Sequence, residues 1–222
     1  MEHEIDFIPG SSIPNRAAYQ YSPLDQAEIR WQIQELLDCG LMPEISSPCV
    51  SLVFLAPKKD GTRRMCIDCK VVNKITIRCR YPLPRMDDIM DDLSGARYFS
   101  KIDLKFGYWQ IRIQEGDQWK TTFKMIDGLY EWIVMPFGLS NALTTFNRLM
   151  NQVLKPFLGK FVIVYLDDIL VYNRTHEEHI LHMREVLEKM KEKELLVNPD
   201  KSVYCQKELI YLGRVYFRGE IS

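Results

Sequence analysis

Two apolar runs that meet at a pair of acids are the feature that most limits how this chain can fold. Residues 162–172 read VIVYLDDILVY, with Asp167 and Asp168 between the runs. A carboxylate in apolar surroundings is costly unless it is paired, protonated or bound to a metal. Adjacent residues on a continuous strand face opposite sides, so both acids can reach one site only if the chain turns there. We therefore expect a β-hairpin that presents both carboxylates at its tip.

A hairpin tip of this kind suits a hard divalent cation. Magnesium takes oxygen ligands and typically uses one or two carboxylates together with substrate phosphates. Asp103 lies in a second apolar run, YFSKIDLKFGYWQIRI, and supplies a third carboxylate. Three converging acids would raise one another's pKa unless a metal neutralised them. The set fits two-metal phosphoryl transfer, and the alternative interpretation is a solvent-facing turn.

The net charge of -1 conceals a strongly basic stretch between Lys58 and Arg85. This stretch holds nine basic residues against two acids, which gives 9 - 2 = +7. Such a surface can bind the phosphates of a nucleic acid or a nucleotide. It can equally be a solvated strand face balanced by acids elsewhere, and charge alone does not separate the two.

Composition sets wide bounds on the architecture. With 222 residues, 46% of them hydrophobic, the chain can bury a large core as one domain or as two joined lobes. No apolar run approaches the roughly 18 residues that span a bilayer, and the acidic start MEHEIDFIPG is unlike a signal peptide. We expect no membrane partner.

Cysteines and histidines give weaker signals. The six cysteines are expected to be reduced, and Cys66 and Cys69 lie in the alternating run MCIDCKVVNKITI, read as a strand. Their spacing favours packing over a zinc site, because it places them on opposite faces of a strand. His176, His179 and His182 are interpreted as solvated helix histidines rather than as metal ligands.

Helix signals recur along the chain. Ser22 and Pro23 form a helix start, and Gly40 a stop. A short amphipathic helix is expected around 86–93, a helix capped by Ser140 or Asn141 follows MPFG, and Thr175 with Glu178 forms a capping box. Between the helices lie a hairpin with a Lys-Asp-Gly turn, a hairpin with an Asp127-Gly128 turn and a strand pair around 211–213. This order predicts an α+β fold with an antiparallel sheet backed by helices.

Many ordered motifs resemble one family. They include SPCVSLVFLAPKKDGTRRMCIDCKVVNKIT, YPLPRMDDI, FSKIDLKFGYWQIRI, EGDQWKTTF, GLYEWIVMPFGLSNA, FVIVYLDDILVY, EEHILH and YLGRV. Together they resemble the reverse transcriptase of gypsy-type LTR retrotransposons, most closely of plant elements, over nearly the whole chain. The resemblance implies a right-hand polymerase, with fingers at about 20–85 and 118–140 and palm at about 86–117 and 141–222.

The resemblance implies an RNA-directed DNA polymerase that transfers dNTPs to a primer 3′-hydroxyl with two magnesium ions, for which manganese can substitute. Asp103, Asp167 and Asp168 would be the catalytic metal ligands, with Asp168 the more peripheral. The partners would be an RNA or DNA template with its primer.

Further roles are carried over position by position. Lys58 and Arg64 resemble the residues that clasp the incoming triphosphate, and Tyr108 the residue under the sugar that excludes a 2′-hydroxyl. From the residues alone, Tyr108 would read as a core aromatic. The resemblance places Phe137 and Gly138 beside the nucleotide and template, and Leu212 and Gly213 in the primer grip.

The chain departs from the family pattern at four positions. Phe106 stands where a small residue is usual, Leu143 replaces a proline, Arg63 a tryptophan and Arg214 a histidine. A bulky ring at 106 can block nucleotide binding, and Leu143 loses the rigid turn of a proline. The competing hypothesis is therefore an eroded, non-catalytic remnant that folds and at most binds nucleic acid.

The resemblance ends after the palm. The thumb, and the protease, ribonuclease H and integrase of a parent polyprotein, are expected to be missing, which would weaken binding to primer-template. For an active element the expected location is an intracellular, cytoplasmic particle. A telomerase-type or RNA-templated viral polymerase is a more distant alternative, because PKKDG and MPFGLSNA point elsewhere.

Overall fold

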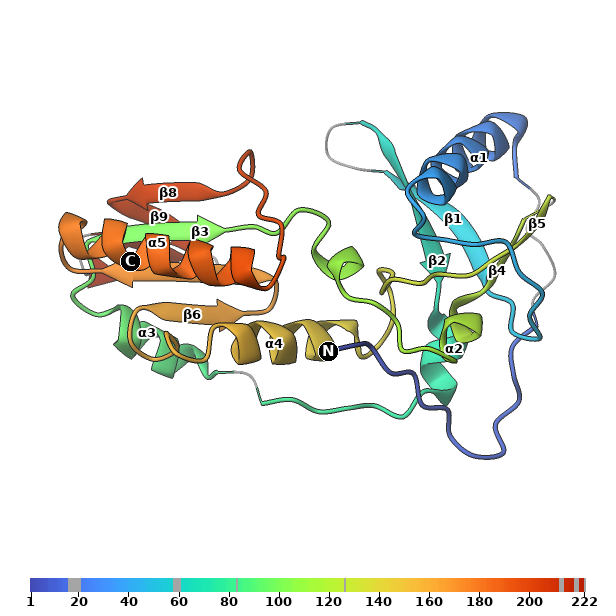
Figure 1. Cartoon of the computed structure of the whole chain (residues 1–222), viewed down its shortest axis with the longest axis horizontal. Coiled ribbons are helices and arrows are strands. Elements are labelled where there is room, and N and C mark those ends of the chain that lie inside the picture. The colour runs from blue at the N-terminus through green and yellow to red at the C-terminus, as the bar shows by residue number, and fades with distance from the viewer. Residues whose placement is uncertain are drawn as a thin grey trace. The chain divides into compact units, whose positions relative to one another are not determined.

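The computed structural model describes residues 1–15, 21–57, 61–82, 84–125, 127–211, 214–217 and 220–221. The chain forms two compact units, each made of two segments (Figure 1). The first unit comprises Met1–Cys79 and Tyr108–Ala142, and the second comprises Arg80–Gly107 and Leu143–Ser222. The expected α+β class, with antiparallel sheets and helices, is confirmed.

The first unit is built from one long helix, several short ones and two hairpins. Its elements are α1 (Pro23–Asp38), β1 (Leu52–Pro57), β2 (Arg63–Asp68), α2 (Lys70–Ile75), η2 (Gln118–Thr121), β4 (Phe123–Met125) and β5 (Gly128–Tyr130), with η1 (Gly107–Gln110) at its border. The predicted start of α1 is confirmed, since Ser22 Oγ accepts a hydrogen bond from the backbone N–H of Asp25 and Pro23 opens the helix.

The two hairpins of the first unit are linked to each other at Ser51. β1 pairs antiparallel with β2 from Leu52↔Asp68 to Pro57↔Arg63, and β4 pairs with β5. Ser51, just before β1, bridges to Phe123 of β4. Phe123 is fully buried, so the core of this unit lies where the two hairpins meet.

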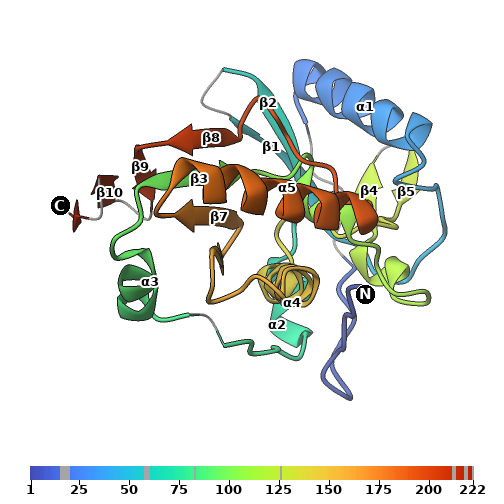
Figure 2. The same ribbon diagram turned by 60° about the vertical axis from the view of Figure 1, so that its left-hand side comes forward.

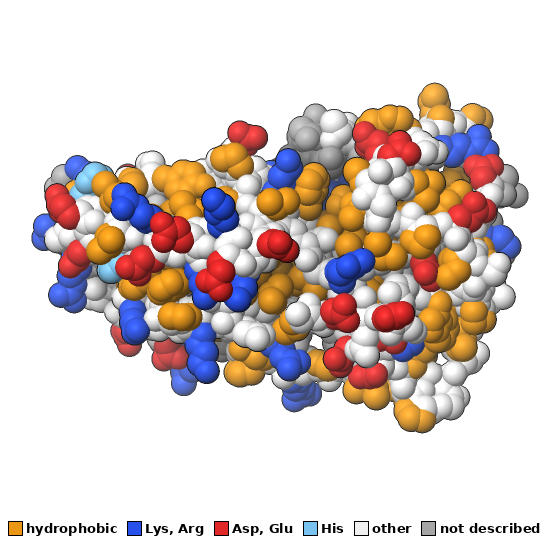
Figure 3. All heavy atoms as spheres, in the orientation of Figure 1, with side chains coloured by type: hydrophobic (Ala, Val, Ile, Leu, Met, Phe, Trp, Pro, Cys, Tyr) orange, Lys and Arg blue, Asp and Glu red, His pale blue; other side chains and the backbone are white. Residues whose placement is uncertain are grey.

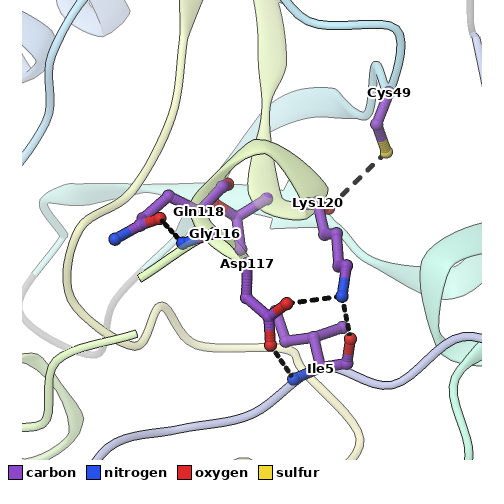
Figure 4. A network of polar contacts seen from close by, with 7 residues as sticks. Ile5, Cys49, Gly116, Asp117, Gln118 and Lys120 are labelled. Atoms are coloured by element: carbon purple, nitrogen blue, oxygen red, sulfur yellow. Dashed lines mark hydrogen bonds and ion pairs between the residues drawn. The ribbon is translucent and has the colours of Figure 1, made fainter. Parts of the chain in front are cut away.

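The N-terminal segment is fastened to the first unit by a polar network (Figure 4). Asp117 Oδ2 accepts a hydrogen bond from the backbone N–H of Ile5 at 2.7 Å, and Lys120 Nζ donates to the Ile5 carbonyl and to Asp117 Oδ1. Lys120 also lies over the rings of Phe7 and Trp119. A mostly buried ammonium with two oxygen acceptors is well compensated, so this network holds the segment around Ile5 and Phe7 in place.

The second unit contains the longest helix among the described residues and the main sheet. Its elements are α3 (Met86–Leu93), β3 (Tyr98–Ile102), α4 (Ala142–Val153, beginning at the border), β6 (Val162–Tyr165), β7 (Asp168–Asn173), α5 (His176–Glu192), β8 (Val203–Gln206), β9 (Glu208–Tyr211), β10 (Arg214–Phe217) and β11 (Glu220–Ile221). Among the described residues the main sheet has the antiparallel order β6-β7-β3-β8, and β11-β10-β9 form a second sheet.

Helices cover both faces of the main sheet (Figure 2). On one face Phe99 packs with Ile89 and Leu93 of α3. On the other face Ser100 meets His179 of α5. Because neighbouring strand residues point to opposite faces, β3 is buried on both sides and forms the centre of this unit.

Two local predictions from the sequence are wrong. The run MCIDCKVVNKITI is a strand only to Asp68, after which Cys69 begins the helix α2. Gly128 is the first residue of β5, paired with Met125, and so lies outside the turn. In the first place hydrophobic alternation extended the expected strand past the point where hydrogen bonding changes. In the second, the Asp-Gly signature placed the turn one residue too late, because the pairing of β4 with β5 begins at Gly128. All six cysteines are free, and burial raises the pKa of Cys69 to about 12, which suits a packing role.

The interpretation of the histidine run as solvated is wrong at one of its three positions. His179 is fully buried, whereas His176 is exposed. Nδ1 of His179 lies 2.9 Å from Asn173 Oδ1, and its Nε2 lies 2.7 Å from Ser100 Oγ. Burial lowers the pKa of His179 to about 4. The neutral ring therefore links α5 to β3 and β7 through its two hydrogen bonds.

The outer surface of α5 mixes charged and apolar side chains (Figure 3). Ile180 and Leu181 are about half exposed. A shallow, mostly apolar groove runs between α5 and β8, lined by Ile180, Met183, Arg184, Leu187, Glu188, Lys191, Tyr204 and Cys205. Within the described residues, no helix is long and apolar enough to span a membrane.

Candidate active site

The hairpin that carries the adjacent acids has a two-residue turn. β6 and β7 pair antiparallel as far as Tyr165↔Asp168, which leaves Leu166 and Asp167 at the tip. Leu166 has a φ of 55°, a left-handed conformation that is strained for a leucine. The turn predicted from VIVYLDDILVY is confirmed, with Asp168 as the first residue of β7.

The third acid follows directly after β3. The last pair between β3 and β7 is Ile102↔Ile169, so the same register places Asp103 opposite Asp168. The backbone of Asp103 is held by the segment before β8: its N–H donates to Ser202 Oγ at 3.0 Å, and its carbonyl accepts from the Asn198 N–H at 2.8 Å. These bonds fix the main chain at the point where the carboxylate projects.

The three acids form one electrostatic cluster. Burial raises the pKa of Asp103 above its ordinary value, and the negative charges of Asp168 and Asp167 raise it further. The positive charges of Lys201 and Lys101 oppose this rise. The charged form of Asp103 is therefore disfavoured in this cluster, and a bound cation would relieve that penalty.

One of the acids is engaged by a lysine. Nζ of Lys101 lies 2.8 Å from Asp168 Oδ1, and both side chains are more than two-thirds buried, at 28% and 29% exposure. Across the part of the chain that the structure describes, no three His, Cys, Asp or Glu side chains converge closely enough to hold a metal ion as they stand. The donor set nevertheless fits magnesium or manganese, because it consists of carboxylate oxygens whose mutual repulsion a hard cation offsets.

Three predicted nucleotide-binding residues meet in the first unit. Cζ of Arg64, on β2, lies 5.2 Å from the ring centroid of Phe137, and the Tyr108 ring lies 5.1 Å from the Phe137 ring. Phe137 is 37% exposed, so this stack presents an aromatic and a guanidinium face to solvent. A guanidinium beside exposed rings can bind phosphate and stack on a base.

Gly138 brings the chain close to the end of β2. Its φ is 102°, and a Cβ there would lie 3.4 Å from the Ile67 carbonyl oxygen and 3.5 Å from Cys69 Sγ. Asn73 of α2 donates to the Gly138 carbonyl at 2.8 Å, which secures the turn that carries Phe137. The predicted site residues Lys58, Leu212 and Gly213 lie outside the described residues.

Sequence reasoning missed Lys101. Its only signal was position, because Lys101 stands two residues before Asp103 and so shares its face of β3. Whether that side chain would reach Asp168 depends on the pairing of β3 with β7, which the sequence alone did not give.

Comparisons with known proteins agree with this geometry. The family model described as Reverse transcriptase (RNA-dependent DNA polymerase) matches residues 56–216. The Retrovirus-related Pol polyprotein from transposon 297 of Drosophila melanogaster is 39% identical over 97% of this chain and 21% of its own length. An RNA-directed DNA polymerase homolog of Oenothera berteroana is 54% identical over 56% of this chain and 90% of its own length. The Enzymatic polyprotein of Cauliflower mosaic virus is 36% identical over 87% of this chain and 29% of its length.

Solved structures agree as well. The foamy viral protease-reverse transcriptase in complex with an RNA/DNA hybrid matches 97% of this chain and 29% of that chain, with a TM-score of 0.85 and 26% identity. The same protein in complex with double-stranded DNA gives a TM-score of 0.86 and 27% identity, over 96% of this chain and 38% of that chain. The chain spans less than a third of the two polyproteins above. These matches, together with the acid cluster, show that the chain belongs to the reverse transcriptase family. The members of this family are RNA-directed DNA polymerases, a class of nucleotidyltransferases.

Proposed function

We propose that this chain is the fingers and palm of an RNA-directed DNA polymerase that forms part of a gypsy-type retrotransposon polyprotein of plant-like origin. The observation that carries the proposal is the clustering of Asp103, at the end of β3, with Asp167 and Asp168 at the β6–β7 turn. The first unit would act as the fingers and the second as the palm. The template would be RNA, and later DNA, bound mainly through its backbone.

The acids define the chemistry. Asp103, Asp167 and Asp168 would hold two divalent ions, magnesium or manganese, with Asp168 the more peripheral. When bound, the ions lower the pKa of the primer 3′-hydroxyl and stabilise the departing pyrophosphate. The task of this chain is to hold the carboxylates in place, and the rigid backbone of Asp103 and the short turn at Leu166 suit that task.

The first unit would hold the incoming nucleotide. Arg64 would bind the triphosphate together with Lys58, and Tyr108 would lie under the sugar and exclude a 2′-hydroxyl. Phe137 and Gly138 would line the nucleotide and template side. The contacts of Arg64 and Tyr108 with Phe137 support this grouping. Leu212 and Gly213 would set the primer end.

Primer extension on poly-rA/oligo-dT with magnesium or manganese tests the proposal. We expect extension by the original chain and a loss of at least about a thousandfold with Asp167→Asn, because electrostatic stabilisation of the transition state is the largest single contribution to such chemistry. Asp91→Asn, an exposed acid on α3, is the matched control. Extension that survives Asp167→Asn rules out the metal site.

Sugar selection separates the nucleotide-binding roles from the metal site. Tyr108→Ala should extend with rNTPs at a rate closer to that with dNTPs, because the ring that meets the 2′-hydroxyl is gone. Phe137→Ala serves as the comparison, since it removes a ring from the same stack. An unchanged preference for dNTPs in Tyr108→Ala contradicts the assignment.

The second candidate is a remnant that binds nucleic acid without turnover. Phe106 favours it, because this residue has a φ of 61° and is 57% exposed three residues after Asp103. If the original chain binds nucleic acid but does not extend a primer, and Phe106→Ser restores extension, Phe106 is the cause of the lost activity. If Phe106→Ser gains nothing over the original chain, Phe106 is not the cause.

A further inference from the structure

Lys101, Asp103 and Asp168 share one face of the main sheet. Lys101 and Asp103 are two residues apart on and just after β3, and the β3–β7 register places Asp168 opposite Asp103. Lys101 therefore reaches Asp168 along the diagonal of the ladder, which is within range for a long side chain. The 2.8 Å contact is consistent with this geometry.

The ion pair between Lys101 and Asp168 lies where it can affect both the stability of the sheet and metal binding. Like charges that face each other across a sheet destabilise it, and Asp103 faces Asp168. Both Lys101 and Asp168 are more than two-thirds buried, so solvent screens their attraction less than that of an exposed pair. An ammonium that donates to Asp168 Oδ1 also occupies one of the two carboxylate oxygens through which Asp168 could bind a metal ion.

Lys201 and Lys101 act mainly on different acids of the cluster. Lys201 has a larger effect on Asp103 than Lys101 has, whereas Lys101 makes its direct contact with Asp168. Lys201 precedes β8 and Lys101 lies on β3, so the two cations reach the cluster from neighbouring strands. The counter-ion of Asp168 is therefore Lys101, a residue of the neighbouring strand β3.

We propose that Lys101 is a positioning residue that holds the Asp168 carboxylate beside the metal ligands but outside their coordination shell. The ions are then bound by Asp103 and Asp167, and Asp168 contributes charge at one remove. The inference rests on the proposed polymerase function. It gives Lys101 a role of its own, namely to set which of the three acids binds metal.

Metal affinity distinguishes this role from a purely structural one. If Lys101 competes with metal for Asp168, then removing the lysine charge makes a third carboxylate available. Lys101→Met should therefore bind Mn²⁺ at least about fivefold more tightly, the effect of one unit charge at roughly 4 Å in water. Asp168→Asn alone should weaken Mn²⁺ binding, because it removes a negative charge beside the ligands and leaves the Lys101 charge unpaired.

The experiment is a double-mutant cycle on the full chain. The dissociation constant for Mn²⁺ is measured from the electron paramagnetic resonance signal of free Mn²⁺ for the original chain, Lys101→Met, Asp168→Asn and the double variant. We expect the double variant to return to the original affinity, because the gain in Lys101→Met comes from Asp168. Lys101→Arg should keep the original value, since it preserves the ion pair.

Two further variants complete the design. Lys101→Gln tests the same charge loss if Lys101→Met does not fold, with folding checked by circular dichroism. Lys160→Met, an exposed lysine of the same unit, controls for net charge and should change the affinity by less than about twofold.

The failures are distinguishable. Equal affinity in the original chain and both neutral Lys101 variants overturns the inference alone, as does a gain that Asp168→Asn does not reverse. The proposed metal site predicts that the original chain binds Mn²⁺ and that Asp167→Asn abolishes this binding. If either result fails, the metal site is wrong and the inference falls with it.

Discussion

Oγ of Ser100 lies 2.7 Å from Nε2 of the fully buried His179, on the face of β3 opposite to Lys101 and the acid cluster. The Cys205 N–H donates to the same Ser100 Oγ at 2.9 Å. Neutral His179 can accept from Ser100 through Nε2 and donate to Asn173 through Nδ1. The strand that positions Asp103 is thus held from behind by a hydrogen-bonded histidine.

This arrangement predicts acid lability of the second unit. Burial lowers the pKa of His179 from 6.5 to about 4, with smaller contributions from the charges of His176 and His182. The unfolded chain therefore takes up the proton first, so stability is complete above pH 6.5 and is lost as the pH falls toward 4. Between pH about 7.5 and about 5 the loss should be about 2 kcal/mol.

Urea unfolding followed by circular dichroism checks this loss. His179→Gln should lower stability at neutral pH but flatten its dependence on pH, whereas exposed His176→Gln should leave the dependence unchanged. All four tryptophans lie in the first unit, so tryptophan fluorescence reports that unit separately. An undiminished pH dependence in His179→Gln contradicts the assignment.

Charge repulsion in the acid cluster predicts a stability effect that changes sign with metal. Without metal, Asp103→Asn should stabilise the chain by less than about 1 kcal/mol, because it removes one of three facing negative charges that solvent partly screens. With excess Mn²⁺ the original chain should gain stability by mass action and the variant should not.

Thermal unfolding with chelator and with Mn²⁺ measures both effects. Asp91→Asn, on α3, should shift neither curve. An Asp103→Asn variant that Mn²⁺ still stabilises as strongly as the original chain would show that Asp103 is not a ligand.

The backbone of Phe106 predicts that residues which tolerate a positive φ stabilise this position. Its φ of 61° is costly for a side chain with a Cβ, and the ring is 57% exposed, with Lys105 Nζ 5.5 Å from its centroid. Phe106→Gly should raise the free energy of unfolding by about 1 kcal/mol. Phe106→Asn should have a smaller effect, and Phe106→Val should destabilise because it is β-branched. The order of these variants in urea unfolding is the test, and a stabilising Val would be inconsistent with it.

We expect an alanine at position 138 to lower the free energy of unfolding by more than the strain of the φ angle alone. Gly138→Ala must adopt a φ of 102° and place a methyl 3.4 Å from the Ile67 carbonyl oxygen. Gly116 has a φ of 89° with no atom near its absent Cβ, so Gly116→Ala measures the angle alone. We expect about 1 kcal/mol for Gly116→Ala and about 2 kcal/mol for Gly138→Ala, measured by tryptophan fluorescence. Equal losses would mean that the close approach adds nothing.

Local signals in the sequence predicted much of the fold. The Ser22 cap of α1, the Thr175–Glu178 capping box of α5 and the turn between β6 and β7 all depend on neighbouring residues, and all three are confirmed. The strand and helix bounds failed where hydrophobic alternation ran on, as it did from Asp68 into α2.

The sequence by itself determined that Asp167 and Asp168 lie at a hairpin turn, because a pair of carboxylates between two apolar runs has few stable arrangements other than a hairpin tip. It determined the family as well, through motifs spread over most of the chain. Only the tertiary structure decided that Lys101 contacts Asp168 and that His179 is buried. Both outcomes depend on strand register and on which helix covers which face, and these are set by contacts between residues far apart in the chain.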